Sequence, residues 1–148
     1  MNTIFRAGLA GLAAAAVMSV APIAPAFAET QTYKAALTGA AQVPPVTTKG
    51  SGTITCSYDT ATKKLTWTVT YTDLSGPPTA AHFHGPAAAG ANAGVVVPQK
   101  DGLASPMKGE ATLTDAQAAD LQAGRWYFNV HTDANKGGEI RGQVVKGM

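Results

Sequence analysis

Apolar and polar side chains alternate with a period of two along much of this 148-residue chain. The pattern is clearest in segments 53–58 and 65–72, where apolar residues alternate with threonine and serine. Such alternation is typical of a β-strand with one buried face and one solvated face. The polar residues 59–64 between the two segments predict a turn, so we expect a β-hairpin. Its apolar face consists of Ile54, Cys56, Tyr58, Leu65, Trp67, Val69 and Tyr71.

The same alternation predicts further strands elsewhere in the chain. They are expected at residues 32–38, 79–84, 126–131 and 140–144. Residues 85–109 are rich in Gly, Ala, Pro and Asn and predict a long loop, which includes one short strand at 95–97.

One short helix is expected to begin after Thr114. Thr114 and Gln117 fit a capping box, and Gly124 suits the left-handed residue that closes a helix. Short strands at intervals of roughly 8–12 residues predict an all-β fold, an antiparallel β-sandwich or barrel with one short helix.

The first 28 residues differ in composition from the rest. Arg6 is followed by an apolar run, and Ala26-Phe27-Ala28 ends the segment before Glu29. This is the pattern of a secretory signal peptide. We therefore expect a secreted or periplasmic protein, with a single β-sandwich domain at 29–148 and no membrane span after cleavage of the signal peptide.

Charge and cysteine content exclude several classes of function. The chain has 11 basic and 9 acidic residues, and these are scattered rather than clustered. Nucleic acid is therefore not expected as a partner. Cys56 is the only cysteine, so no intramolecular disulfide can form. Its place in the alternating pattern predicts a buried thiol.

All three histidines lie in two strand-like segments. His82 and His84 are two residues apart and are expected to share one face of a strand, with Phe83 on the other face. His131 lies opposite the bulky apolar residues of its own segment. We therefore expect the three imidazoles to form one metal site, and copper or zinc suits such ligands. A structural role for hydrogen-bonded histidines is the alternative.

Residues near His131 are candidates for orienting the ligands. If Phe128 and Val130 face the core together with Ile140, His131 shares its face with Glu139 and Arg141. Asn129 lies on the same face of the strand as His131. Glu139, Arg141 and Asn129 are therefore candidate neighbours of the site. Alternatively, Glu139 and Arg141 form a surface ion pair with each other.

Three segments, 81–87, 124–132 and 137–143, resemble the CHRD domain, a family named for repeats in chordin that also includes single-domain secreted bacterial proteins. Their sequences are AHFHGPA, GRWYFNVHT and GGEIRGQ. The resemblance extends from about residue 33 to 145. It implies a secreted β-sandwich that is similar to immunoglobulin domains or to superoxide dismutase.

The sequence leaves three functions open. The first is a binding protein that holds copper or zinc through His82, His84 and His131. The second is a structural or adhesion module that contacts an unknown protein or glycan. The third is an enzyme similar to copper superoxide dismutase, which the small number of histidines disfavours. No residue is assigned to catalysis, and a non-enzymatic protein is favoured.

Overall fold

The computed structural model describes residues 27–147, and within them it contains eight β-strands, one α-helix and one 3-10 helix. The predicted signal peptide lies outside the described residues, apart from its last two, and stays a prediction. In chain order the elements are β1 Thr30–Thr38, η1 Gly39–Ala41, β2 Ser51–Asp59, β3 Lys64–Thr72, β4 Pro78–His84, β5 Val95–Pro98, β6 Met107–Thr112, α1 Asp115–Gln122, β7 Trp126–Thr132 and β8 Ile140–Lys146.

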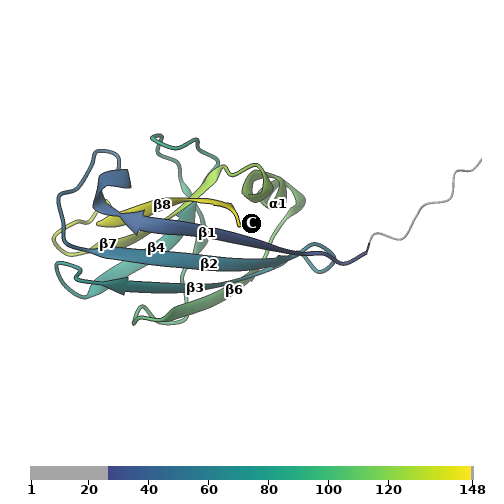
Figure 1. Cartoon of the computed structure of the whole chain (residues 1–148), viewed down its shortest axis with the longest axis horizontal. Helices are drawn as coiled ribbons and strands as arrows, with labels where there is room; N and C mark the ends of the chain where they lie inside the picture. Colours follow the sequence, from purple (N-terminus) through teal and green to yellow (C-terminus); the bar gives the residue numbers. More distant parts are fainter. Residues whose placement is uncertain (1–26, 148) are drawn as a thin grey trace, which may run out of the picture.

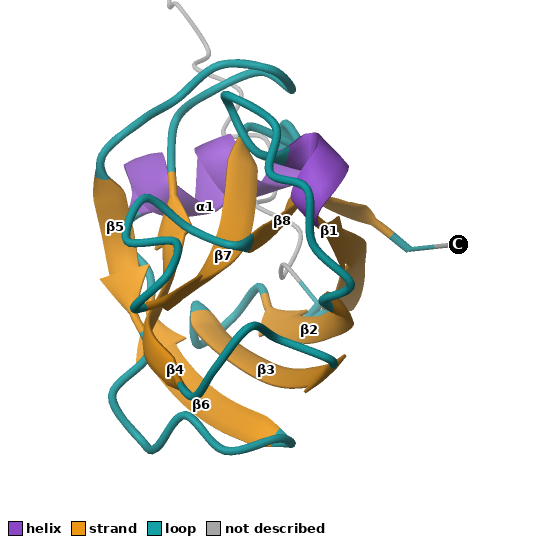
Figure 2. Ribbon diagram, turned by 90° about the vertical axis from the view of Figure 1, so that its left-hand side faces the viewer, coloured by secondary structure: helices purple, strands orange, loops and turns teal. Residues whose placement is uncertain are grey.

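Hydrogen bonds link the eight described strands into one antiparallel sheet, in the order β5-β4-β7-β8-β1-β2-β3-β6 (Figure 1). The predicted all-β, antiparallel class with one short helix is therefore confirmed. The sheet curls strongly, so that β4, β5 and β7 lie across from β2 and β3 (Figure 2). The fold is thus nearly barrel-like, and the immunoglobulin-like sandwich stays a prediction.

Two sets of contacts join opposite parts of the curled sheet. In the interior, the rings of Trp67 on β3 and Phe83 on β4 meet edge to face, with their centroids 5.0 Å apart. Where the two edges of the sheet approach each other, the Gln99 side chain makes three hydrogen bonds. Its Oε1 accepts a 2.7 Å hydrogen bond from Trp67 Nε1, and its Nε2 donates to the carbonyls of Gly102 and Lys108. Gln99 follows β5 and Lys108 lies in β6, so this amide links the two edges of the sheet.

The predicted hairpin is confirmed, because β2 and β3 pair from Ser51–Thr72 to Tyr58–Leu65. Cys56 lies on its inner face with only 1% of its surface exposed, as the alternation predicts. Burial raises the pKa of the Cys56 thiol to about 12, so the thiol is neutral at physiological pH.

The helix is also confirmed, including its cap. The Thr114 side chain accepts a hydrogen bond from the backbone N–H of Gln117, and the Gln117 side chain accepts one from the Thr114 N–H. Leu121 is fully buried, and Gly124 has a φ of +67° just beyond the end of the helix. No helix in the described residues is long and apolar enough to cross a membrane.

The prediction of one long loop over 85–109 is wrong in its last part, where β6 begins at Met107. The β6 sequence MKGEAT lacks a clear apolar alternation, so its local pattern gives little signal. Pairing with β3 stabilises it instead, and that pairing places Gly109 opposite Trp67. A Cβ on Gly109 would lie 2.4 Å from the Trp67 ring, so only glycine fits there without displacing the indole.

Glu139 is fully buried, and its carboxylate fastens two loops to the sheet. It accepts hydrogen bonds from the hydroxyls of Thr48, Ser75 and Thr132, at 2.6 to 2.7 Å, and from the Ser75 backbone N–H at 2.9 Å. Burial alone raises the pKa of Glu139, but these hydrogen bonds outweigh it and hold the pKa at about 2.

We expect Gly109→Ala to destabilise the protein by about 1–3 kcal/mol, because the new methyl group must displace the packed Trp67 ring. The measurement is the free energy of unfolding from urea titration. Gly76→Ala is the matched control, because no atom lies within 4 Å of the position that its Cβ would take. It should change stability by less than about 0.5 kcal/mol. Equal effects of the two substitutions would contradict the proposed packing.

We expect Glu139 to make stability depend on pH at the acid end. A folded-state pKa of about 2, against 4.5 for an unperturbed side chain, favours the ionised folded state by about 3 kcal/mol at neutral pH. This contribution is complete well above pH 4.5 and is lost as the pH falls toward 2. Urea unfolding at pH 7 and pH 3 measures it. Glu139→Gln should destabilise the protein at pH 7 and flatten this pH dependence, whereas the exposed Glu110→Gln should leave both nearly unchanged.

Candidate metal site

Strands β4 and β7 place the three histidines on one face of the sheet. They are antiparallel neighbours, and His82 pairs with Asn129 while Ala80 pairs with His131. Paired residues in antiparallel strands share a face. The opposite face of the two strands is fully buried at Phe83, Phe128 and Val130, so the imidazoles project away from the core.

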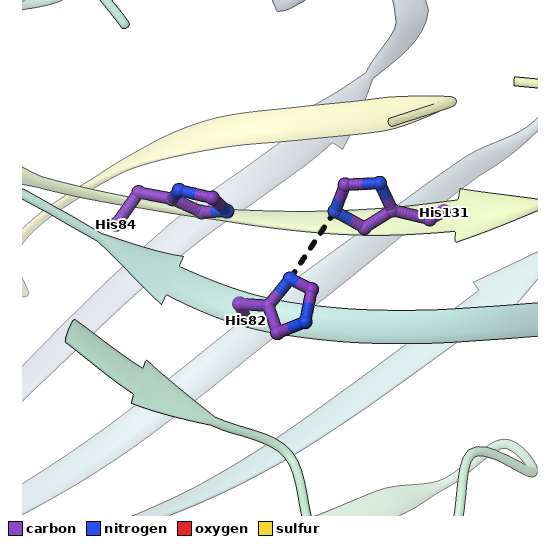
Figure 3. Close-up of side chains that lie close together, drawn as sticks. All are labelled: His82, His84 and His131. Carbon is purple, nitrogen blue, oxygen red and sulfur yellow. Dashed lines mark hydrogen bonds between the residues drawn. The ribbon is translucent and has the colours of Figure 1, made fainter. Parts of the chain in front are cut away.

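The three imidazoles meet, as the sequence predicts (Figure 3). His82 Nδ1 lies 3.2 Å from His131 Nε2, and one nitrogen of each of the three rings lies within 4.8 Å of the others. Two ligands bonded to one zinc or copper ion at about 2.0–2.1 Å can be at most about 4.2 Å apart. Tetrahedral coordination places such nitrogens about 3.4 Å apart, so the most distant pair must approach by up to about 1.4 Å before all three share an ion.

Backbone carbonyls fix the orientation of two of the rings. His84 Nδ1 lies 2.9 Å from the Ala93 carbonyl oxygen, and His131 Nδ1 lies 2.8 Å from that of Lys136. A carbonyl oxygen only accepts, so in both rings Nδ1 must carry the proton and donate it. The neutral forms of His84 and His131 therefore present unprotonated Nε2 atoms to each other, as metal ligands do.

Asn129 lies between these two nitrogens. Its Oδ1 is 3.0 Å from His84 Nε2 and 3.0 Å from His131 Nε2. With both imidazoles neutral, three lone-pair atoms then face one another with no proton between them. Either a bound cation or a 180° turn of the Asn129 amide, which brings its NH₂ group to the rings, removes this repulsion.

His82 and His84 are set to be neutral rather than cationic. Burial lowers the pKa of His82, and the neighbouring His131 and His84 lower it further. Burial also lowers the pKa of His84, and it outweighs the hydrogen bonds to Ala93 and Asn129, which raise it. Neutral imidazoles are the form that binds metal ions.

The loop after β4 covers this face, starting directly after His84. The Tyr127 ring lies parallel to the His84 ring, with their centroids 4.8 Å apart. The Tyr127 hydroxyl accepts from the Ala93 N–H at 3.1 Å and lies 3.2 Å from the Ala93 oxygen. The Arg141 guanidinium lies 3.4 Å from the centre of the Tyr127 ring. Sequence reasoning does not single out Tyr127, and it cannot find the two carbonyls, because backbone acceptors have no sequence signature.

Of the candidate neighbours of His131, the structure brings two to this face and not the third. Asn129 contacts the rings, and Arg141 pairs with Asn129 across β7 and β8. The Glu139 carboxylate instead bonds to Thr48, Ser75 and Thr132. Glu139 precedes β8, which begins at Ile140, so strand alternation does not direct its side chain.

The expected surface ion pair between Glu139 and Arg141 is absent from the described residues, and both side chains are buried, with 0% and 2% of their surfaces exposed. The expectation of an exposed pair is therefore wrong. Each of the two side chains is bound by uncharged groups instead.

Comparison with known proteins identifies the family. The chain matches none of the curated proteins and none of the solved structures with which it was compared. A family model, described as the CHRD domain, matches residues 33–144. The matched range includes every strand that carries the candidate site, and it covers most of the chain. The chain therefore belongs to the CHRD domain family.

Proposed function

We propose that this CHRD-domain protein binds one transition-metal ion through His82, His84 and His131. The observation that carries the proposal is the meeting of three imidazoles, two of which have their Nδ1 protons engaged by carbonyl oxygens. Two unprotonated Nε2 atoms therefore face the same point. His82 Nδ1, at 3.2 Å from His131 Nε2, completes a set of three nitrogens.

Copper and zinc are the ions that this ligand set favours. Imidazole nitrogen suits both, and Cu²⁺ binds nitrogen sites more tightly than Zn²⁺ does. Cys56 is buried on the opposite face of the sheet among core residues, so it is not a ligand. Three protein ligands leave one position of a tetrahedral ion for water or another small ligand.

The proposal places the protein outside the cytoplasm, in the periplasm or the extracellular space. Support comes from the signal-peptide pattern in the first 28 residues and from membership of a family that includes secreted proteins. The role proposed there is binding rather than catalysis. A structural or adhesion module without metal is the second candidate, because a His82 to His131 hydrogen bond at 3.2 Å also accounts for one of the contacts without an ion.

We expect metal-stripped protein to take up one equivalent of Cu²⁺ or Zn²⁺, with Cu²⁺ bound more tightly. His84→Ala and His131→Ala should each weaken binding at least about 100-fold, and the triple variant with His82→Ala should retain no ion after dialysis. Elemental analysis and competition with a chelator of known affinity measure this. Because an ion that binds only the folded state stabilises it, excess Zn²⁺ should also raise the melting temperature of the wild type alone.

Cys56→Ala is the matched control, since it removes the buried thiol from the core and leaves all three imidazoles in place. It should retain one equivalent of metal. Asn129→Leu keeps the size of the side chain but removes the amide next to the two Nε2 atoms, and it should weaken binding about 10–100-fold. If the wild type and the triple-histidine variant retain equal amounts of copper and zinc, the metal site is refuted and the structural role remains.

A further inference from the structure

A cavity of about 370 Å³ lies between η1, the connection that follows it and the loop after β4. Its size is within the range of sites that hold small molecules. Alanines together with Val43 and Pro45 form its apolar wall, and its polar residues are Gln42, Arg141 and Gln143. Both Nε2 hydrogens of Gln143 are directed to the carbonyls of Ala87 and Gly124, so that amide nitrogen belongs to the wall.

Arg141 is a buried cation without an acidic partner. Only 2% of its surface is exposed, and no carboxylate of residues 27–147 forms an ion pair with it. Its Nη1 donates to Asn92 Oδ1 at 2.7 Å, and its Nη2 donates to the Ala91 carbonyl at 2.5 Å. A guanidinium has five N–H groups, so three remain for other acceptors. Burial of an unpaired charge is costly unless an opposite charge approaches it.

Gln42 also lines the cavity, but its amide nitrogen is fully buried. The residue is 5% exposed, and its Nε2 has no hydrogen-bond acceptor among the described residues. Buried polar groups in proteins are nearly always hydrogen-bonded. This amide nitrogen lies against Gly138 and the Asn129 amide and has almost no accessible surface, so Arg141 alone offers donors to the cavity.

We propose that this cavity binds a small carboxylate through Arg141. A planar guanidinium fork matches the two oxygens of a carboxylate, which also neutralises the buried charge. The apolar wall of alanines, Val43 and Pro45 suits a short hydrocarbon group attached to that carboxylate. This apolar wall favours an organic acid over a fully hydrated inorganic anion such as sulfate.

The volume limits the ligand. One water molecule occupies about 30 Å³ in the liquid, so the cavity holds a ligand of roughly a dozen non-hydrogen atoms at most. A free short-chain acid and the carboxyl end of a peptide share this chemistry. The Tyr127 ring contacts both Arg141 of this cavity and His84 of the candidate metal site. The cavity and the three histidines are therefore separate sites, and binding in the cavity does not require a bound metal.

Titration of the metal-stripped protein with sodium butyrate, followed by calorimetry and by NMR shifts, tests the proposal. Butyramide and sodium sulfate serve as the neutral and the inorganic controls, and N-acetylalanine, with nine non-hydrogen atoms, is the peptide arm. We expect one butyrate per chain, with shifts at Gln42, Ala89 and Arg141, and at least about 10-fold weaker binding of both controls. Tighter binding of the peptide than of butyrate identifies a chain terminus as the source of the carboxylate.

Variants separate the site from general effects of charge. Arg141→Met retains the apolar stem over Tyr127 and should weaken butyrate binding at least about 10-fold. The exposed Arg125→Met is its matched control and should not change binding.

If Arg141→Met does not fold, Ala89→Phe decides, because it fills the cavity from an exposed position without removing any polar group. The absence of butyrate binding to the wild type would overturn the proposal. So would equal binding of sulfate, or equal loss of binding in Arg125→Met and Arg141→Met.

Discussion

The antiparallel register between β4 and β7 is the constraint on which both the core and the candidate site depend. With His82 opposite Asn129, every second residue of the two strands faces the interior and the rest face the site. Phe83 and Phe128 stack edge to face in the core, with centroids 4.9 Å apart, and hold this register. A shift by one residue would bury the imidazoles and expose the phenylalanines, so the energy of core packing also keeps the histidines together.

Much of this arrangement could be predicted from the sequence because it follows from alternation. The hairpin of β2 and β3, the buried Cys56, the cap at Thr114 and the meeting of His82, His84 and His131 all depend on which residues share a face. Such relations are local, or they need only the assumption that two strands are neighbours. These relations hold whether the strands form one curled sheet or two packed sheets, a distinction that does not follow from the sequence.

What could not be predicted depends on contacts between distant segments. Strand β6 forms because Gly109 fits beneath Trp67, and nothing in its own pattern shows that. Glu139 departs from the expected face because β8 has not yet begun, so the loops that contain Thr48 and Ser75 capture its carboxylate. Such contacts join residues that are far apart in the sequence, and a period of two gives no information about which distant residues meet.

The two carbonyl acceptors of Ala93 and Lys136 also affect which changes of sequence the site can tolerate. Nearly any residue type supplies a backbone oxygen, so no single side-chain replacement at position 93 or 136 removes these acceptors. Their positions depend on the path and length of the two loops, 85–94 and 133–139. A family in which the histidines are retained should therefore tolerate changes of residue in these loops far better than insertions or deletions of even one.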